Sequence, residues 1–545
     1  MASSGQIRRV HCKHLCTRWV DLSVLAICLI LPVDSTCAQT AKEQYQREIL
    51  EIQHHIEQND LEGARLLIQK AKSSFPRDGG LENLLGVVDI QQGHAKAAIE
   101  QFSAAISHEP SLTGAYLNLG RIYMQSAESD KSARATALET YEKLLHKEPE
   151  NPEANYQAAM LLMWDQKYQA SLEHLAQLNS EDRGRIGAQI VLCADEAALN
   201  HVSAADKAAA VLDAAPDLQE QDALEVLPAL RAAHRADLIE SIFAAANARS
   251  PLSANGFRIL GLAQEGEGKL DAARATLESA FVKSDSSVEI LVDLTRVANA
   301  AKDYQGALGY LAHARDLEPK NASFAYEFGV LSLRLSLLGE SRKAMAEAVQ
   351  LDPDNPDYNF GMGIVSSFSQ DATQGLPFLK KYHALRPSDP AATLAIGTTY
   401  FRAKSFDDAI SWLKQAALDK TTAADAHYYL GRIARVEGHL DDAKQELQKA
   451  IILSPDRPDI LAELGQVSIA SHQYPDAQSY LDRAVALEPE NYAANFGLLQ
   501  LYARTGDARR EQQSNRFDEI KNKDEAHYQE MMRIINVQKV EAPVK

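Results

Sequence analysis

Apolar and small residues recur along most of the chain at helical spacing, and they predict helix pairs that repeat with a period of about 34 residues. The clearest copy is 424–455, ADAHYYLGRIARVEGHLDDAKQELQKAIILSP. Each half carries a stripe of apolar and small side chains, and Glu437-Gly438-His439 between the halves predicts a turn. Pro455 ends the second helix because proline has no amide hydrogen to donate. The stretch therefore predicts a helical hairpin.

One glycine recurs inside the first helix of each pair. A glycine within a helix costs about 1 kcal/mol against alanine, so its regular return indicates a neighbouring helix that comes too close for a side chain. Gly329, Gly363, Gly397, Gly431 and Gly465 follow one another at this period, and Gly86, Gly120 and Gly261 hold the same place. The same period relates Ala273, Ala307, Ala409, Ala443 and Ala477, and Pro319, Pro353, Pro387, Pro455 and Pro489.

At these residues the sequence resembles the tetratricopeptide repeat (TPR) family. The family's 34-residue helix-turn-helix pattern has Leu-Gly in the first helix, small residues in the second and a terminal proline. The resemblance implies an all-α fold, a right-handed α-solenoid (superhelix) of about 13–14 repeats. It also implies a concave groove that binds extended peptides or partner helices.

The chain divides by how closely it follows the period. We expect N-terminal repeats over 39–149, degenerate repeats over 150–251, a regular array over 252–506, and a charged capping helix and tail over 507–545. The third unit has about five extra residues in its turn, 125–132, where added length costs little. A separate small domain is the alternative for 150–251, and a self-association helix is the alternative for the last segment.

The segment 1–38 has the pattern of a signal peptide. An apolar run, 22–31, follows a basic head and precedes a small-residue end that suits cleavage before Gln39. The run is shorter than the roughly 20 residues of a transmembrane helix. We therefore expect export, to the periplasm or as a secreted protein, with no integral membrane span in the mature chain; an uncleaved N-terminal anchor is the alternative. The basic residues of the head are Arg8, Arg9, Lys13 and Arg18.

The net charge and the cysteine content exclude several classes of function and of site. The formal net charge is -19, with 75 acidic against 56 basic residues, which argues against a nucleic-acid or anionic-membrane binder that acts through bulk charge. Four of the five cysteines leave with the signal peptide, so the mature chain keeps only Cys193 and no internal disulfide. The His and Cys cluster at 11–16 lies in the same removable segment, so we expect no metal site there.

We expect no enzyme and no cofactor. The sequence has no Gly-rich phosphate loop, no His-Glu-x-x-His, no nucleophile elbow and no Cys-x-x-Cys. Helix pairs account for every long stretch, and the unrepeated tail of about 40 residues is too short to bury a catalytic core of its own.

A candidate binding surface follows from helical geometry. In the clearest copy His427, Leu430, Gly431 and Ala434 share the face that packs inside the repeat, and a second face lies about 140 degrees away. In proteins of this family the second face lines the groove, and we call it the groove face. Carried to neighbouring repeats, it yields the candidate partner-binding residues Tyr326, Arg334, Phe360, Phe368, Phe401, Arg402, Tyr428, Arg432 and Arg435.

Rings and arginines together suit an extended ligand with carboxylates and apolar side chains. The alternative is that Phe360, Phe368 and Phe401 pack between adjacent first helices while the arginines are solvated. The groove face lacks the Lys and Asn clamp of TPR proteins that grip chaperone tails. Only Asn118 fits the asparagine ladder of sugar-transferase solenoids, so neither activity is transferred.

Two hypotheses for function follow. The first is a non-enzymatic scaffold that binds other proteins outside the cytoplasm. The second resembles the TPR scaffolds of exopolysaccharide synthesis and export or of envelope assembly, whose partners are the polysaccharide machinery. Neither hypothesis involves nucleic acid.

Charge reversal of Arg432 and Arg435 together is expected to weaken partner capture and to leave the helix content intact, because both residues lie away from the packing face. Affinity capture measures the first effect and circular dichroism the second. Unchanged capture would count against the groove hypothesis.

Overall fold

The computed structural model describes residues 36–523, with side chains from residue 44 onward, and over this range it contains no β-strand. The apolar run 22–31 of the predicted signal peptide, the basic head and the tail from residue 524 lie outside the described residues. The chain divides into two compact units, 1–283 and 284–545, which we call the N-terminal unit and the C-terminal unit.

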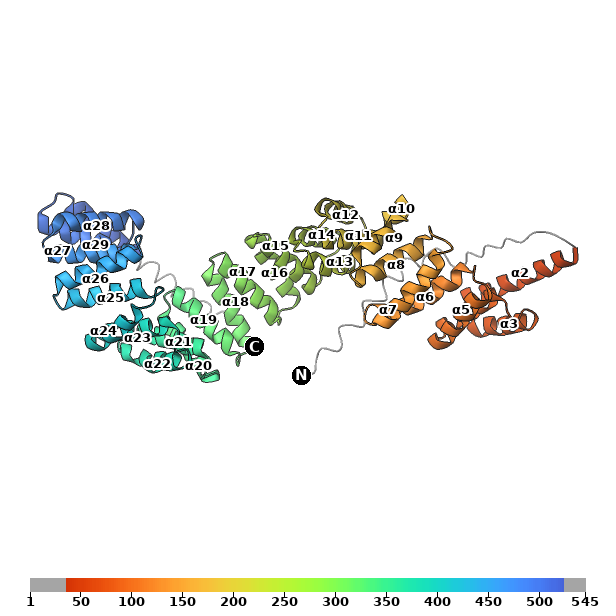
Figure 1. Cartoon of the computed structure of the whole chain (residues 1–545), viewed down its shortest axis with the longest axis horizontal. Helices are drawn as coiled ribbons and strands as arrows, with labels where there is room; N and C mark the ends of the chain where they lie inside the picture. Colours follow the sequence, from red (N-terminus) through yellow and green to blue (C-terminus); the bar gives the residue numbers. More distant parts are fainter. Residues whose placement is uncertain (1–35, 524–545) are drawn as a thin grey trace. The chain divides into compact units, whose positions relative to one another are not determined.

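The N-terminal unit consists of helical hairpins that pack on one another in chain order (Figure 1). Its helices are α2 (Thr36–Glu57), α3 (Leu61–Ser74), α4 (Gly79–Gln91), α5 (Ala95–His108), α6 (Thr113–Ala127), α7 (Lys131–Leu145), α8 (Pro152–Trp164), α9 (Tyr168–Ala176), α10 (Ser180–Arg183), α11 (Ile186–Ala198), α12 (Val202–Ala214), α13 (Glu220–Ala232), α14 (Ala236–Arg249), α15 (Ala254–Gly266) and α16 (Leu270–Lys283).

The C-terminal unit is built in the same way (Figure 1). Its helices are α17 (Val288–Ala300), α18 (Tyr304–Leu317), α19 (Ala322–Arg334), α20 (Leu338–Leu351), α21 (Pro356–Ser366), the 3-10 helix η2 (Ala372–Gly375), α22 (Leu376–Leu385), α23 (Pro390–Arg402), α24 (Phe406–Ala416), α25 (Ala423–Val436), α26 (Leu440–Leu453), α27 (Pro458–Ala470), α28 (Tyr474–Leu487) and α29 (Tyr492–Thr505). A last helix, 510–523, packs on α29 through Phe517, whose ring lies 4.8 Å from that of Tyr492.

These hairpins confirm the predicted all-α solenoid of repeats. Residues 36–523 hold fourteen helix pairs when α29 is paired with helix 510–523, in agreement with the expected 13–14 repeats. The predicted division into four segments after the signal peptide stays a prediction.

The recurring glycine lies where the two helices of a pair meet, as predicted. A Cβ atom added to Gly431 would lie 2.6 Å from Leu447 Cγ, which is closer than atoms pack. Each glycine of the series faces one large side chain of its own second helix. The pairs are Gly86 with Phe102, Gly120 with Tyr141, Gly261 with Leu277, Gly329 with Met345, Gly363 with Leu379, Gly397 with Leu413, Gly431 with Leu447 and Gly465 with Leu481.

The spacing within these pairs locates the inserted residues. The partner follows the glycine by 16 residues in every pair except Gly120 with Tyr141, where the offset is 21 residues. The difference is five residues, the length that the sequence predicted for the longer turn. The insertion therefore leaves the contact between α6 and α7 unchanged.

The glycine's place also continues through 150–251, where the sequence pattern is blurred. Ala159, Cys193 and Leu227 hold this place at the same period, and all three are buried. The residues 16 positions later are buried too, and they are Leu175, Ala209 and Phe243. The segment thus forms helix pairs in register with the rest, although it has no glycine at this place.

Most turns inside a pair place one residue in the left-handed conformation, the region of positive φ that favours glycine. In the C-terminal unit the turn after α21 is the exception, because η2 replaces the tight turn there. A Cβ atom on Gly375, the last residue of η2, would collide with the carbonyl oxygen of Gly363. The left-handed residues are Asn59, Gly93, Gln166, Asn200, His234, Gly268, Lys302, Ser336, Lys404, Gly438, His472 and Gly506.

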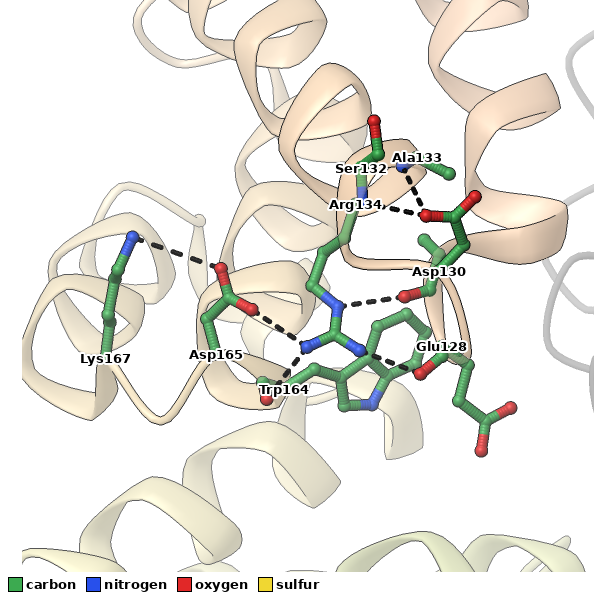
Figure 2. A network of polar contacts seen from close by, with 9 residues as sticks. Glu128, Asp130, Ser132, Ala133, Arg134, Trp164, Asp165 and Lys167 are labelled. Carbon is green, nitrogen blue, oxygen red and sulfur yellow. Dashed lines mark hydrogen bonds and ion pairs between the residues drawn. The ribbon is translucent and has the colours of Figure 1, made fainter.

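A buried arginine fixes the longer turn to the next repeat (Figure 2). Arg134, on α7, is 8% exposed and donates to the carbonyl oxygens of Ala127 and Glu128 at 2.9 and 2.8 Å, at the end of α6. It also donates to Trp164 O at 3.1 Å and to Asp165 Oδ1 at 2.8 Å, at the end of α8. One guanidinium thus satisfies the carbonyl groups of two helix ends.

Asp195 on α11 is the most unusual buried residue of the N-terminal unit. It is 0% exposed, and neither carboxylate oxygen has a hydrogen-bond partner among the described residues. Burial raises its pKa from 3.8 to about 7, and Glu196 adds to the rise. The Ser171 hydroxyl offsets part of the shift but donates its own hydrogen bond to Ala159 O at 2.8 Å. The ionised form therefore destabilises the fold.

Gly431→Ala is expected to destabilise the α25–α26 pair by about 1–3 kcal/mol, because Leu447 is fully buried and cannot move aside. Gly339→Ala is the matched control: it lies on α20 with no atom within 4 Å of an added Cβ, and should stabilise by up to about 1 kcal/mol. Hydrogen exchange of peptides from the two helix pairs measures both effects. Equal effects of the two substitutions would contradict the close-contact explanation.

The stability of α8–α12 is expected to fall as the pH rises. Asp195 has a higher pKa in the folded state than in the unfolded state. It is protonated in both states below about pH 4 and ionised in both above about pH 7. The free energy of unfolding therefore falls between these two pH values. The full loss of unfolding free energy is about 4 kcal/mol. Leu161 holds the equivalent place one repeat earlier. Asp195→Leu introduces the same residue type and should abolish this pH dependence. Hydrogen exchange of these helices at pH 5 and pH 8 tests it; a pH dependence retained in the variant would assign it to other groups.

Candidate functional site

The nine predicted groove residues lie on the first helices of the C-terminal unit or directly after one. Their places are α19 for Tyr326 and Arg334, α21 for Phe360, the turn after α21 for Phe368, α23 for Phe401 and Arg402, and α25 for Tyr428, Arg432 and Arg435. On the opposite face of α25, Leu430 and Gly431 are buried, and His427 Nδ1 lies 2.5 Å from Glu446 Oε2 of α26. The helix thus presents its packing face to its own repeat, as the sequence predicted.

Three rings surround the guanidinium of Arg432. Its Cζ atom lies 5.0 Å from the ring centroid of Phe401, 5.4 Å from that of Tyr428 and 5.9 Å from that of Tyr429. The rings also touch one another, with 5.2 Å between the centroids of Phe401 and Tyr429. Arginine above aromatic faces is held by cation–π attraction, which strengthens when water is excluded.

Glu463 of α27 completes this group. It is 9% exposed and accepts a hydrogen bond from Arg435 Nε, while its other oxygen lies 3.7 Å from Arg432 Nε. We call Phe401, Tyr428, Tyr429, Arg432, Arg435 and Glu463 the arginine cluster. It holds two positive charges and one negative charge.

Two other arginines lie against rings on their own. Arg402 Cζ is 3.8 Å from the ring centroid of Phe368, and Arg334 Cζ is 5.3 Å from that of Tyr304. Phe368 is 44% exposed. Arg334 also donates to Asn299 Oδ1 at 3.4 Å, and neither arginine forms an ion pair with any side chain described between residues 44 and 523. These arginines therefore add positive charge to the groove face of an acidic protein.

The remaining two rings pack against tyrosines. Tyr326 and Tyr358 have centroids 5.0 Å apart, and Phe360 and Tyr382 have centroids 4.7 Å apart. Burial raises the pKa of Tyr326 above its usual value and raises the pKa of Tyr428 to about 12. Both hydroxyl groups are therefore neutral near pH 7 and able to donate a hydrogen bond.

The structure brings only some of the nine predicted groove residues into contact with one another. Phe401, Tyr428, Arg432 and Arg435 share the arginine cluster, Phe368 pairs with Arg402, and the others contact different partners. The rings pack between elements, as the structural alternative proposed, yet the arginines lie against rings and carboxylates. A role of these residues in partner binding stays a prediction.

Sequence reasoning missed the neighbours that complete these contacts, which are Tyr304, Tyr358, Tyr382, Tyr429 and Glu463. Their separation in the sequence from the residues that they contact is a signal that could have identified them. Residues that touch between adjacent repeats on this side are 28 to 34 positions apart, as in Phe401 with Tyr429, Arg432 with Glu463 and Phe368 with Arg402. A search for opposite charges or paired rings at these separations would find most of them.

Glu463 also changes how the arginines are best tested. Reversing Arg432 and Arg435 to glutamate would gather three carboxylates at the α25–α27 contact, where like charges repel. Glutamine at the same positions removes the charge without this repulsion. Neutral variants therefore separate binding from stability more clearly than charge reversal does.

Between residues 44 and 523 no three His, Cys, Asp or Glu side chains are grouped so that they could hold a metal ion. None of the helices in the part of the chain that the structure describes is long and apolar enough to cross a membrane.

The helix pairs and the face that they expose place this chain in the class of all-α helical-repeat proteins. Family models named "Tetratricopeptide repeat" match residues 434–486, 290–356 and 463–510. Together with the helical hairpins that follow the same period from α2 to α29, these matches show that the chain contains tetratricopeptide repeats. Arrays of such repeats are protein-interaction scaffolds that use extended surfaces.

Known proteins add little more. No curated protein matches the sequence. Among solved structures, yeast Tom70 is 14% identical, with a TM-score of 0.39 and coverage of 92% of this chain and 96% of that one. The anaphase-promoting complex hetero-tetramer Cut9–Hcn1 is 14% identical, with a TM-score of 0.36 and coverage of 83% and 89%. A tetratricopeptide repeat protein from Parabacteroides merdae is 15% identical, with a TM-score of 0.35 and coverage of 46% and 98%.

Proposed function

We propose that the protein is a non-catalytic scaffold that holds a protein partner, as an extended peptide or a helix, on the groove face of its C-terminal unit. One observation carries the proposal. Tyr326, Phe360, Leu394 and Tyr428 hold the same place on four successive first helices, and all four are only partly buried. They form an apolar row that water still reaches.

Contacts among the rings make this row suitable for binding. Tyr326 rests on Tyr358, Phe360 on Tyr382, and Tyr428 on Tyr429, with centroids 4.7 to 5.2 Å apart. A ring that is already held in place loses little conformational entropy when a partner covers it. Ring packing within and between repeats therefore prepares the surface for a partner.

We also propose that the partner is met outside the cytoplasm. The support is the basic head, the apolar run 22–31 and the small-residue end before Gln39, which together have the pattern of a signal peptide. A scaffold within an exopolysaccharide export or envelope-assembly machine is the more specific form of this hypothesis.

Site-specific photo-crosslinking tests the proposed surface. A photoreactive phenylalanine at Phe368, a predicted groove residue that is 44% exposed, should give a discrete protein adduct in the native host's exported fraction. The matched control places the same group at Leu418, which follows a second helix and is 86% exposed, and it should give no adduct. Adducts from position 418 alone would overturn the proposed surface. A polymer adduct at position 368 would replace the protein partner with a polysaccharide.

A further inference from the structure

Arg432 has unused hydrogen-bonding capacity. Its guanidinium carries five N–H donors, yet among the described residues it makes no hydrogen bond, and its nearest carboxylate oxygen, on Glu463, is 3.7 Å away. Its Nε atom is buried without a partner. Most buried donors in proteins are satisfied. The two terminal nitrogens of Arg432 also have no hydrogen-bond partner among the described residues, but they are not enclosed, so an acceptor from outside can reach them.

The rings around Arg432 fix it in position. The ring centroids of Phe401, Tyr428 and Tyr429 all lie within 5.9 Å of its Cζ atom, and the side chain as a whole is 32% exposed. Its planar fork therefore reaches the surface at one end in a fixed orientation. A planar, two-oxygen acceptor such as a carboxylate matches this fork.

Arg435 differs from Arg432 because it is already paired. Its Nε donates to Glu463, which is only 9% exposed. Packing does not require an acid at this place, because Gly361, Ala395 and Tyr429 occupy it in three other repeats, although Glu327 holds it in a fourth. Glu463 therefore acts as an internal carboxylate that lies between the two arginines and bonds to one of them.

We infer that Arg432 binds a carboxylate of the partner, next to an apolar side chain that packs on the neighbouring rings, and that Glu463 limits the affinity by competing for the same arginine. The inference rests on the proposed function, since it assigns the ligand chemistry of that groove face. The carboxylate belongs to an Asp or Glu side chain or to the end of a peptide chain.

The geometry gives each residue a different expected effect. Arg432→Gln removes the binding group, so affinity should fall about 10-fold or more. Glu463→Gln removes the competitor, so affinity should rise by about the same factor. Arg435→Gln frees Glu463 to pair with Arg432, so affinity should fall although Arg435 itself does not touch the ligand. Arg432→Lys keeps the charge but loses the fork, so it should restore only part of the binding.

Peptide selection and titration test the inference on the full chain. A random dodecapeptide library displayed on phage is selected on the wild-type protein, and the most enriched peptides are then titrated by fluorescence anisotropy. Selected peptides should share an acidic residue or a free C-terminus beside an aromatic or aliphatic residue. Amidation of the C-terminus and Glu→Gln or Asp→Asn changes in the peptide then distinguish the two sources of the carboxylate.

Matched variants decide the outcome. Arg342→Gln makes the same charge change on α20, a second helix of the same unit, and should leave the affinity unchanged. Circular dichroism checks that every variant is folded. If selected peptides carry no acid and bind Arg432→Gln as well as wild type, yet lose binding when Phe368 is changed to alanine, the carboxylate inference fails while the proposed function stands. If no peptide is enriched, the proposed function fails together with it.

Discussion

The close packing of the two helices of each pair, which in eight of the pairs is made by a helical glycine and one large side chain, is the contact on which the rest of this structure depends. Gly431 against Leu447, and the seven equivalent pairs, bring the two helices of a repeat closer than any side chain at the glycine's place would allow. This close contact fixes which face of the first helix is turned inward. The groove face, with its rings and arginines, is therefore a consequence of where the glycine lies.

Much of the fold could be predicted because this contact leaves a periodic mark in the sequence. The 34-residue spacing indicated the hairpins, the glycine's role and the five-residue insertion. Over 150–251 only degenerate repeats could be predicted, with a separate domain as the alternative, because Ala159, Cys193 and Leu227 replace the glycine there. The wide turn at η2 was missed for a similar reason, since the helices on either side keep the period.

The candidate site was only partly predictable, for a different reason. Helical geometry places Tyr428, Arg432 and Arg435 on one face, but their neighbours come from the next repeats and depend on how first helices lie side by side. The ring of Phe401 against Arg432 and the bond from Arg435 to Glu463 are such contacts. Reasoning within one helix therefore found the residues and missed their partners. The same limit hid Asp195, whose buried carboxylate lies among residues of neighbouring helices.

The central claim is that each hairpin is stabilised mainly by its neighbours in the chain, so that stability is local. Hydrogen exchange of a chain that ends after α26, at Leu453, tests this most directly. Helices α17 to α22 should keep the protection that they have in the full chain, and only α25 and α26, next to the new end, should lose it. A loss of protection spread evenly over the C-terminal unit would contradict the account.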